Sequence, residues 1–255
     1  MFSDLLSLLL GCITIFRVKE PGAFWLTVFL GIALAGLYWY LSSVYTRLWN
    51  KRFRITLAHH IFCGFASICT LLFTILFASL VYTKDAARAS IESWQTQLNA
   101  DGGWGERTFS KAYDRVRELG TEDFSAAPPP GSPGSFIPTN SDESRETAAS
   151  VYANEACRHF DANRPFLSKV VWSSPGVPAE TIFQDVRAWH LKNPNYPPSR
   201  AIEIAATQVR DGLNPQAPRV IYLSRLSVAG LFILIQLIPF GLIGWAAYRD
   251  IKVRL

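Results

Sequence analysis

The chain has 255 residues, of which 49% are hydrophobic and 18% charged, with 25 Lys and Arg against 20 Asp and Glu, for a formal net charge of +5. The basic excess lies outside the central polar segment, because residues 83–222 carry 15 basic and 17 acidic side chains and the remainder carries 10 and 3. Nucleic-acid-binding domains concentrate basic residues on a folded surface, so this distribution excludes nucleic acid as an expected partner.

The N-terminal region, residues 1–21, is apolar but short. Met1–Phe16 carries Asp4 near its start, and no basic segment precedes the apolar run as it would in a cleaved signal peptide. Two alternatives remain for this region. It forms either an interfacial helix at the outer leaflet or a short fourth membrane span.

Three longer apolar stretches follow, and none has an Asp, Glu or Lys in its interior. A bilayer core about 30 Å thick requires about 20 apolar helical residues. Each stretch reaches that length, which predicts an all-α integral membrane protein. The stretches are Phe24–Tyr45, Leu57–Tyr82 and Tyr222–Tyr248, and the transmembrane helices are predicted over residues 22–46, 57–83 and 220–248.

The short segments beside these helices predict the orientation of the chain. Residues 47–56 form a short basic loop, and the tail, residues 249–255, is also basic. Short basic segments remain in the cytoplasm, so residues 84–219 are expected to be extracytoplasmic. Few cysteines and the lack of glycosylation acceptors outside favour a bacterial inner membrane.

Small and hydroxyl residues recur at helical spacing in all three apolar stretches. Such rows let membrane helices approach closely and hydrogen-bond across the contact. The alternative is a hydroxyl-lined pore in an oligomer, but pores usually have ionisable groups or broken helices at mid-membrane depth. We therefore predict helix packing. The packing residues are Gly31 and Ala35 in the first stretch, Ser67, Thr70 and Thr74 in the second, and Gly241 and Gly244 in the third.

The extracytoplasmic segment is predicted to be a mostly helical domain, because its 13 prolines divide it into stretches of helical periodicity. The second membrane helix is expected to continue past Lys84 as far as Asp101, and residues 126–138 form a Pro- and Gly-rich loop. Three further helices are expected. The first runs from an N-cap at Asn140 to Asn163, the second begins at Pro178, and the third runs from Ser199 to Pro215. In the last membrane helix a kink is expected at Pro239.

Residues capable of catalysis are sparse, and the sequence predicts no enzyme, no cofactor and no metal site. Cys157 and His159 are two residues apart and point in different directions on a helix, so Cys157 is interpreted as a small buried residue. His59 and His60 could be haem ligands or interfacial residues, and the lack of a His on another membrane helix favours interfacial residues.

Five aromatic residues lie in or beside Pro-rich loops, where anchors for a binding partner and core side chains are equally expected. These candidates are Trp104, Phe136, Phe166, Trp172 and Tyr196.

The pattern as a whole favours a non-catalytic integral membrane subunit of a larger complex, whose partners are other membrane proteins and the lipid bilayer. The first alternative is a membrane sensor that transmits a signal through its second membrane helix. The second alternative is an oligomeric channel or membrane effector.

Overall fold

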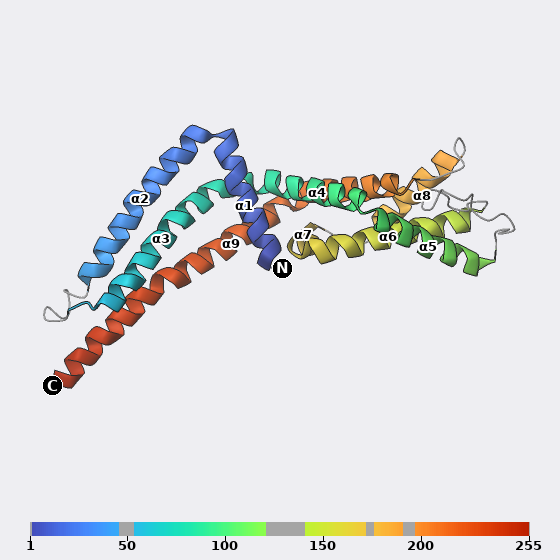
Figure 1. Ribbon diagram of the computed structural model, residues 1–255. Helices are drawn as coiled ribbons and strands as arrows, with labels where there is room; N and C mark the ends of the chain where they lie inside the picture. Colours follow the sequence, from blue (N-terminus) through green and yellow to red (C-terminus); the bar gives the residue numbers. More distant parts are fainter. Residues whose placement is uncertain (1, 46–53, 121–140, 172–175, 191–196, 255) are drawn as a thin grey trace. The chain divides into compact units, whose positions relative to one another are not determined.

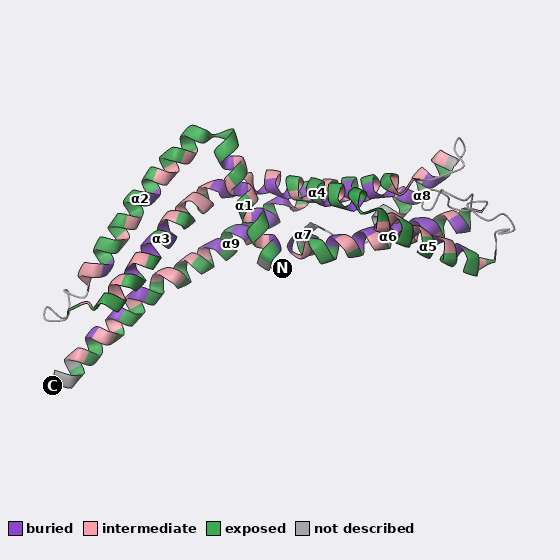
Figure 2. Cartoon of the chain, in the orientation of Figure 1, coloured by how far each residue is buried: buried purple, intermediate pink, exposed green. Residues whose placement is uncertain are grey.

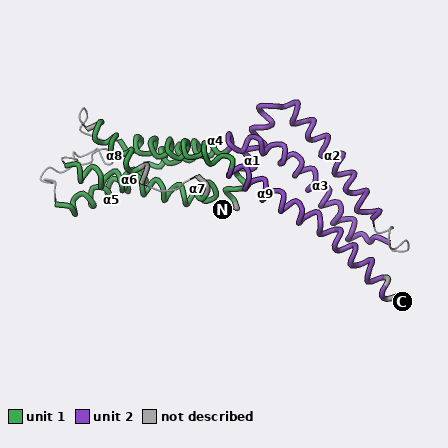
Figure 3. Tube along the Cα trace, turned by 180° about the vertical axis from the view of Figure 1, so that it is seen from behind, with its two compact units in different colours: residues 1–8, 87–218 green, residues 9–86, 219–255 purple. Residues whose placement is uncertain are grey.

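The computed structural model describes residues 2–45, 54–120, 141–171, 176–190 and 197–254, and those residues are almost entirely helical, with no strand among them (Figure 1). The chain divides into two compact units. Unit 1 comprises residues 1–8 and 87–218, and unit 2 comprises residues 9–86 and 219–255 (Figure 3). The predicted Pro- and Gly-rich loop at 126–138 and residues 47–53 of the predicted basic loop lie outside the described residues.

Unit 2 contains the apolar helices. In the described part of the chain, three helical stretches are long and apolar enough to cross a membrane. They confirm the three predicted spans by length and composition. Many residues of these helices are exposed (Figure 2), and large apolar side chains are numerous among them. The stretches are α2 (Pro21–Val44), α3 (Leu57–Ser79) with the helical residues that follow it, and the second half of α9 (Pro198–Arg254).

The N-terminal helix α1 (Phe2–Lys19) is not among these candidate spans. It has Asp4 in its first turn and Arg17 and Lys19 in its last turn. Its first turns belong to unit 1 and the rest to unit 2.

The second apolar helix continues into unit 1 as predicted. A short 3₁₀ turn, η2 (Leu80–Tyr82), joins α3 to α4 (Thr83–Ala100), so the chain stays helical through Lys84. The predicted inward face of α4 is confirmed, because Ala87, Ile91, Trp94 and Leu98 are all buried. Asp101 then ends this helical run and caps the next helix.

The largest departure from the predicted elements is α9. The sequence predicted one helix ending at Pro215 and a separate membrane helix from residue 220, but α9 is a single helix of 57 residues. Proline removes one intrahelical hydrogen bond and crowds the preceding turn, at a cost of about 3 kcal/mol. Leu213, Ala217 and Val220 continue one buried face across this region, and their packing offsets that cost. The helix also continues through Pro239, and the kink predicted there stays a prediction.

The core of unit 1 is built around α6 (Asp142–Asn163). Its predicted face of Ala148, Tyr152, Ala156 and Phe160 is fully buried, and α6 packs most extensively against three neighbouring helices. Alanines on this face allow the helices to approach closely, and the two aromatic rings fill the remaining space. The neighbours are α5 (Gly102–Leu119), α7 (Pro165–Val171) and α8 (Gly176–His190).

Several helices of unit 1 begin or end at residues other than those predicted from the sequence. Ser141, and not Asn140, is the N-cap of α6, since its hydroxyl accepts a hydrogen bond from the Ser144 amide at 3.1 Å. The sequence did not predict α7, which begins at Pro165 because proline suits the first position of a helix. Gly120 ends α5 with a φ of 67°, which glycine adopts without strain.

Candidate helix-binding groove in the membrane unit

The contact between α2 and α3 is made by the predicted small residues. Gly31 is buried, and a Cβ atom at this position would lie 2.7 Å from the Leu71 side chain and 3.4 Å from the Leu71 Cα atom. Ala35 is half-buried on the same face of α2. The absence of a side chain at Gly31 therefore lets α2 approach the backbone of α3.

Hydrogen bonds from side chains to backbone join α9 to α2 and α3. The Tyr38 hydroxyl donates to the Gln236 carbonyl at 3.0 Å, and the Gln236 amide nitrogen donates to the Ala66 carbonyl at 3.1 Å. The Tyr45 hydroxyl donates to the Phe240 carbonyl. Gln236 is not among the predicted packing residues, although an amide within an apolar stretch is itself a signal for a buried contact.

One side of the α2/α3 contact is hollowed into an open apolar groove of about 370 Å³, which we call the α2/α3 groove. Small residues from both helices make the hollow, and larger apolar side chains form its sides. The groove is lined by Ile32, Ala35, Gly36, Trp39, Gly64, Ser67, Ile68 and Leu71.

Ser67 is the distinctive residue of this groove. Its side chain is only 6% exposed, and its hydroxyl has no hydrogen-bond partner among the described residues. The hydroxyls of Thr70 and Thr74 on the same helix donate to the carbonyls four residues earlier, at 2.9 and 2.8 Å. An unpaired buried hydroxyl costs about 1–3 kcal/mol, and because the Ser67 oxygen is itself enclosed, its side chain must rotate toward the groove before a group there could bond it and recover this free energy.

Thr70 and Thr74 line a second apolar groove, of about 420 Å³, on another part of unit 2. Their hydroxyls are already bonded to the backbone of α3, and Phe73, Phe77 and Phe232 supply much of its wall. The predicted hydroxyl row is thus divided between two grooves. This second groove has no unpaired polar group among its lining residues.

The predicted glycines of the third membrane helix differ in their surroundings. Gly241 is exposed, and a Cβ atom there would meet nothing within 4 Å. Gly230, which shares the exposed side of α9, is equally open. Gly244 is half-buried. Within the described residues, Gly241 therefore makes no close helix contact.

The predicted aromatic anchors in unit 1 prove to be core residues where the structure describes them. Trp104 is 4% exposed and Phe166 is 6% exposed. Trp104 lies in the first turn of α5, where its ring packs edge-on against Tyr152. Phe136, Trp172 and Tyr196 lie outside the described residues.

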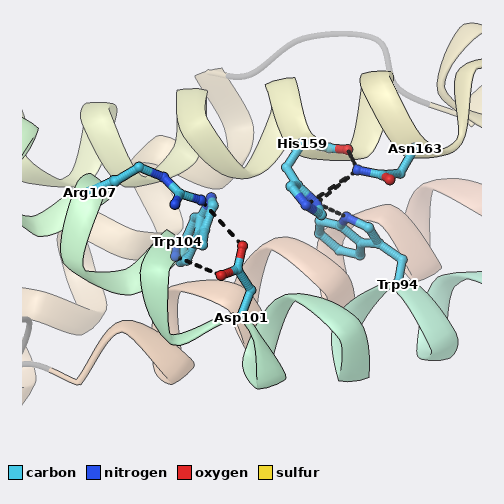
Figure 4. Close-up of polar contacts among 6 residues, drawn as sticks. All are labelled: Trp94, Asp101, Trp104, Arg107, His159 and Asn163. Carbon is cyan, nitrogen blue, oxygen red and sulfur yellow. Dashed lines mark hydrogen bonds and ion pairs between the residues drawn. The ribbon is translucent and has the colours of Figure 1, made fainter.

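Unit 1 also holds a polar cluster around His159 (Figure 4). The indole N–H of Trp94 donates to Nδ1 of His159 at 3.0 Å, and the Asn163 amide donates to the His159 carbonyl at 2.9 Å. Nearby, the Asp101 carboxylate accepts from the Trp104 amide and from Arg107. The Trp94 bond joins α4 to α6 and gives His159 a structural partner, whereas the bonds of Asp101 remain local to the start of α5.

The chemistry of Cys157 agrees with its interpretation as a buried residue. Its side chain is 7% exposed, and burial raises the pKa of the thiol from 9.0 to about 12. A thiol with such a pKa is a poor nucleophile at neutral pH. Across the described residues, no group of three His, Cys, Asp or Glu side chains is placed to hold a metal ion.

The two histidines at the start of α3 each have a local contact. Nδ1 of His59 lies 2.8 Å from the Thr56 hydroxyl, and this pair caps the helix. The His60 ring stacks on Trp39, with 6.5 Å between ring centroids. Both histidines therefore have a contact within unit 2.

Comparison of the chain with protein-family models, with curated proteins and with solved structures gave no match.

Proposed function

We propose that this chain is a non-catalytic integral membrane subunit that binds a transmembrane helix of a partner protein in the α2/α3 groove. The observation that carries the proposal is the combination of small residues with the unpaired Ser67 hydroxyl. Lipid chains offer no hydrogen-bond acceptor, whereas a closely packed helix offers backbone carbonyls. A partner helix is therefore the occupant that fits the small residues and that can accept a hydrogen bond from Ser67 once its side chain rotates toward the groove.

Gly36 gives the sharpest test of this proposal. It lines the groove, and a Cβ atom at Gly36 would meet nothing within 4 Å, so the protomer itself has room for a larger residue. Gly36→Leu is expected to fill the groove and abolish assembly without lowering the thermal stability of the protomer. Gly22→Leu is the matched control, because Gly22 lies on the same helix, is equally open and is outside the groove.

The measurement is the mass of the complex extracted in mild detergent, determined by light scattering. The wild type and Gly22→Leu are expected to give the same mass, well above one chain, and Gly36→Leu the mass of one chain. Ser67→Ala is expected to weaken assembly partially. A wild type that runs as a single chain, or a Gly36→Leu variant with wild-type mass, would exclude the groove as a binding site.

The continuity of two helices favours a membrane sensor as a second candidate function. The helical run from α3 through η2 to α4 passes from unit 2 into unit 1, and α9 passes between the same units without a break. A helix without a flexible joint can transmit a small rotation or translation along its length. A change in the conformation of the cytoplasmic end of α3 when a ligand binds would distinguish this function from a purely structural one.

The proposed location is a bacterial inner membrane with residues 84–219 extracytoplasmic. The support for this orientation is the charge distribution of the sequence, with basic residues concentrated at 47–56 and 249–255.

A further inference from the structure

The N-terminal helix α1 has one face buried in the protein and one face exposed. Residues at four-residue spacing form the buried face, which consists of Asp4, Leu8, Cys12 and Phe16. The exposed face carries apolar side chains, with exposed fractions of 47% at Leu6, 55% at Leu10 and 74% at Val18. Such a face is costly in water and requires an apolar environment.

The N-terminal end of α1 is held by unit 1. The Asp4 carboxylate is 5% exposed and accepts hydrogen bonds from the backbone amides of Phe166 at 2.9 Å and Leu167 at 3.4 Å. These amides are at the start of α7, where a carboxylate satisfies N–H groups that have no partner within the helix. Asp4 therefore lies on the same side of the membrane as the polar residues of unit 1.

The C-terminal end of α1 is held at the end of α3 that leads toward unit 1. The Lys19 ammonium lies 2.6 Å from the Asp85 carboxylate, and the Phe16 ring stacks on Tyr82 at 5.8 Å between centroids. Tyr82 and Asp85 directly follow the apolar part of α3. Both ends of α1 thus contact residues outside the apolar part of α3.

The length of α1 leads to the same conclusion. Fifteen residues separate Asp4 from Lys19, which corresponds to roughly 22 Å of helix and is shorter than a bilayer core of about 30 Å. The exposed charged residues of α1, Arg17 and Lys19, are both basic and lie at one end of the helix. A basic group beside an apolar face complements lipid phosphates above acyl chains.

We infer that α1 does not cross the bilayer but lies in its outer interface, where Leu6, Leu10 and Val18 contact acyl chains and Arg17 contacts headgroup phosphates. The partner of this surface is the lipid itself. The inference is independent of the α2/α3 groove, because it depends only on the contacts of α1 and on the membrane location of the apolar helices.

Nitroxide labels along the exposed face of α1 test this inference. Leu6→Cys, Leu10→Cys and Val18→Cys are labelled singly in the full chain, and the four native cysteines are buried, so unsubstituted protein measures background labelling. Membrane depth is obtained for each label from the relative accessibility to oxygen and to a water-soluble nickel chelate, in vesicles of phosphatidylethanolamine and phosphatidylglycerol. Leu72→Cys, on the exposed side of α3, gives a deep reference, and Ser93→Cys, exposed on α4, gives an aqueous one.

An interfacial helix is expected to give three shallow depths that agree within a few ångströms. A spanning helix would instead give a progressive change of roughly 18 Å from residue 6 to residue 18, with the Leu10 label approaching the Leu72 depth. Labels on α1 as accessible to the nickel chelate as the Ser93 label would place the helix in water. Either of these two results would overturn the inference.

Discussion

Gly31 is the residue whose substitution most directly tests the packing of α2 on α3. In Gly31→Leu the new side chain would meet Leu71, including its backbone, so the two helices must separate. We expect the free energy of unfolding to fall by about 1–3 kcal/mol, as for other overpacked contacts. Thermal unfolding in detergent measures this change.

The control for this substitution is Gly230→Leu, where a Cβ atom would meet nothing within 4 Å. It places the same side chain on an apolar helix and should leave the unfolding temperature within experimental error of the wild type. Equal destabilisation by both variants would show that the close approach at Gly31 is not what stabilises this contact.

His159 makes the stability of unit 1 dependent on pH. Desolvation lowers the pKa of His159 below its ordinary value of 6.5, the Asp101 carboxylate acts in the opposite direction, and Arg107 lowers the pKa further. The unfolded chain therefore binds a proton at higher pH than the folded chain. Stability is complete above about pH 6.5 and is lost as the pH falls toward the folded pKa.

The geometry gives this titration a structural cause, because a protonated Nδ1 cannot accept the Trp94 N–H. We expect unfolding of the wild type, followed by tryptophan fluorescence, to shift to lower temperature between pH 7.5 and pH 5. In His159→Gln, which keeps a hydrogen-bond acceptor, this part of the shift should disappear. An identical pH dependence in both proteins would show that His159 does not contribute to it.

At the scale of elements, α7 depends on a cap that is distant in sequence. In Asp4→Ala the amides of Phe166 and Leu167 lose their acceptor, at a cost of about 1 kcal/mol for a helix cap. We expect their hydrogen exchange to accelerate roughly fivefold. Ser3→Ala, at an exposed neighbouring position, should leave exchange in α7 unchanged, and Asp4→Asn should restore part of the protection.

The same element shows why part of the fold could not be predicted from the sequence. The helices were predicted well where the capping residues and the spacing of apolar residues indicate the same element. The inward faces of α4 and α6 are examples. The start of α7 depends on Asp4, 162 residues away in the chain, and no local pattern reports such a bond. Similarly, the prolines in α9 favour a break, and only its burial within unit 1 reveals why the helix continues.

The candidate site was predictable to a similar degree. Helical spacing placed Gly31 and Ser67 on faces that contact or flank a neighbouring helix, and both are buried. Spacing alone could not distinguish Ser67, whose hydroxyl is unpaired, from Thr70, whose hydroxyl bonds its own backbone. That difference depends on the local conformation of each side chain.

For the whole molecule, the two units bury their large apolar side chains to different degrees, and we expect them to be stabilised differently. Unit 1 buries Trp94, Tyr152 and Phe160 in its own core, whereas the helices of unit 2 expose most of their large apolar side chains. In water the first arrangement is driven by the hydrophobic effect. In a bilayer the second depends on close packing and internal hydrogen bonds, such as those of Tyr38 and Gln236.

The orientation of the whole chain provides a final prediction. Outside residues 83–222 the chain carries 10 basic and 3 acidic residues, and short basic segments resist transfer across the membrane. We therefore expect Ser93→Cys on α4 to react with an impermeant maleimide in intact cells. Thr56→Cys, exposed at the start of α3, should react only after permeabilisation.

The wild type is the control for background reaction, because its four cysteines are buried. The reverse pattern would mean that the basic segments lie outside, and labelling of both positions in intact cells would mean that the chain inserts in two orientations.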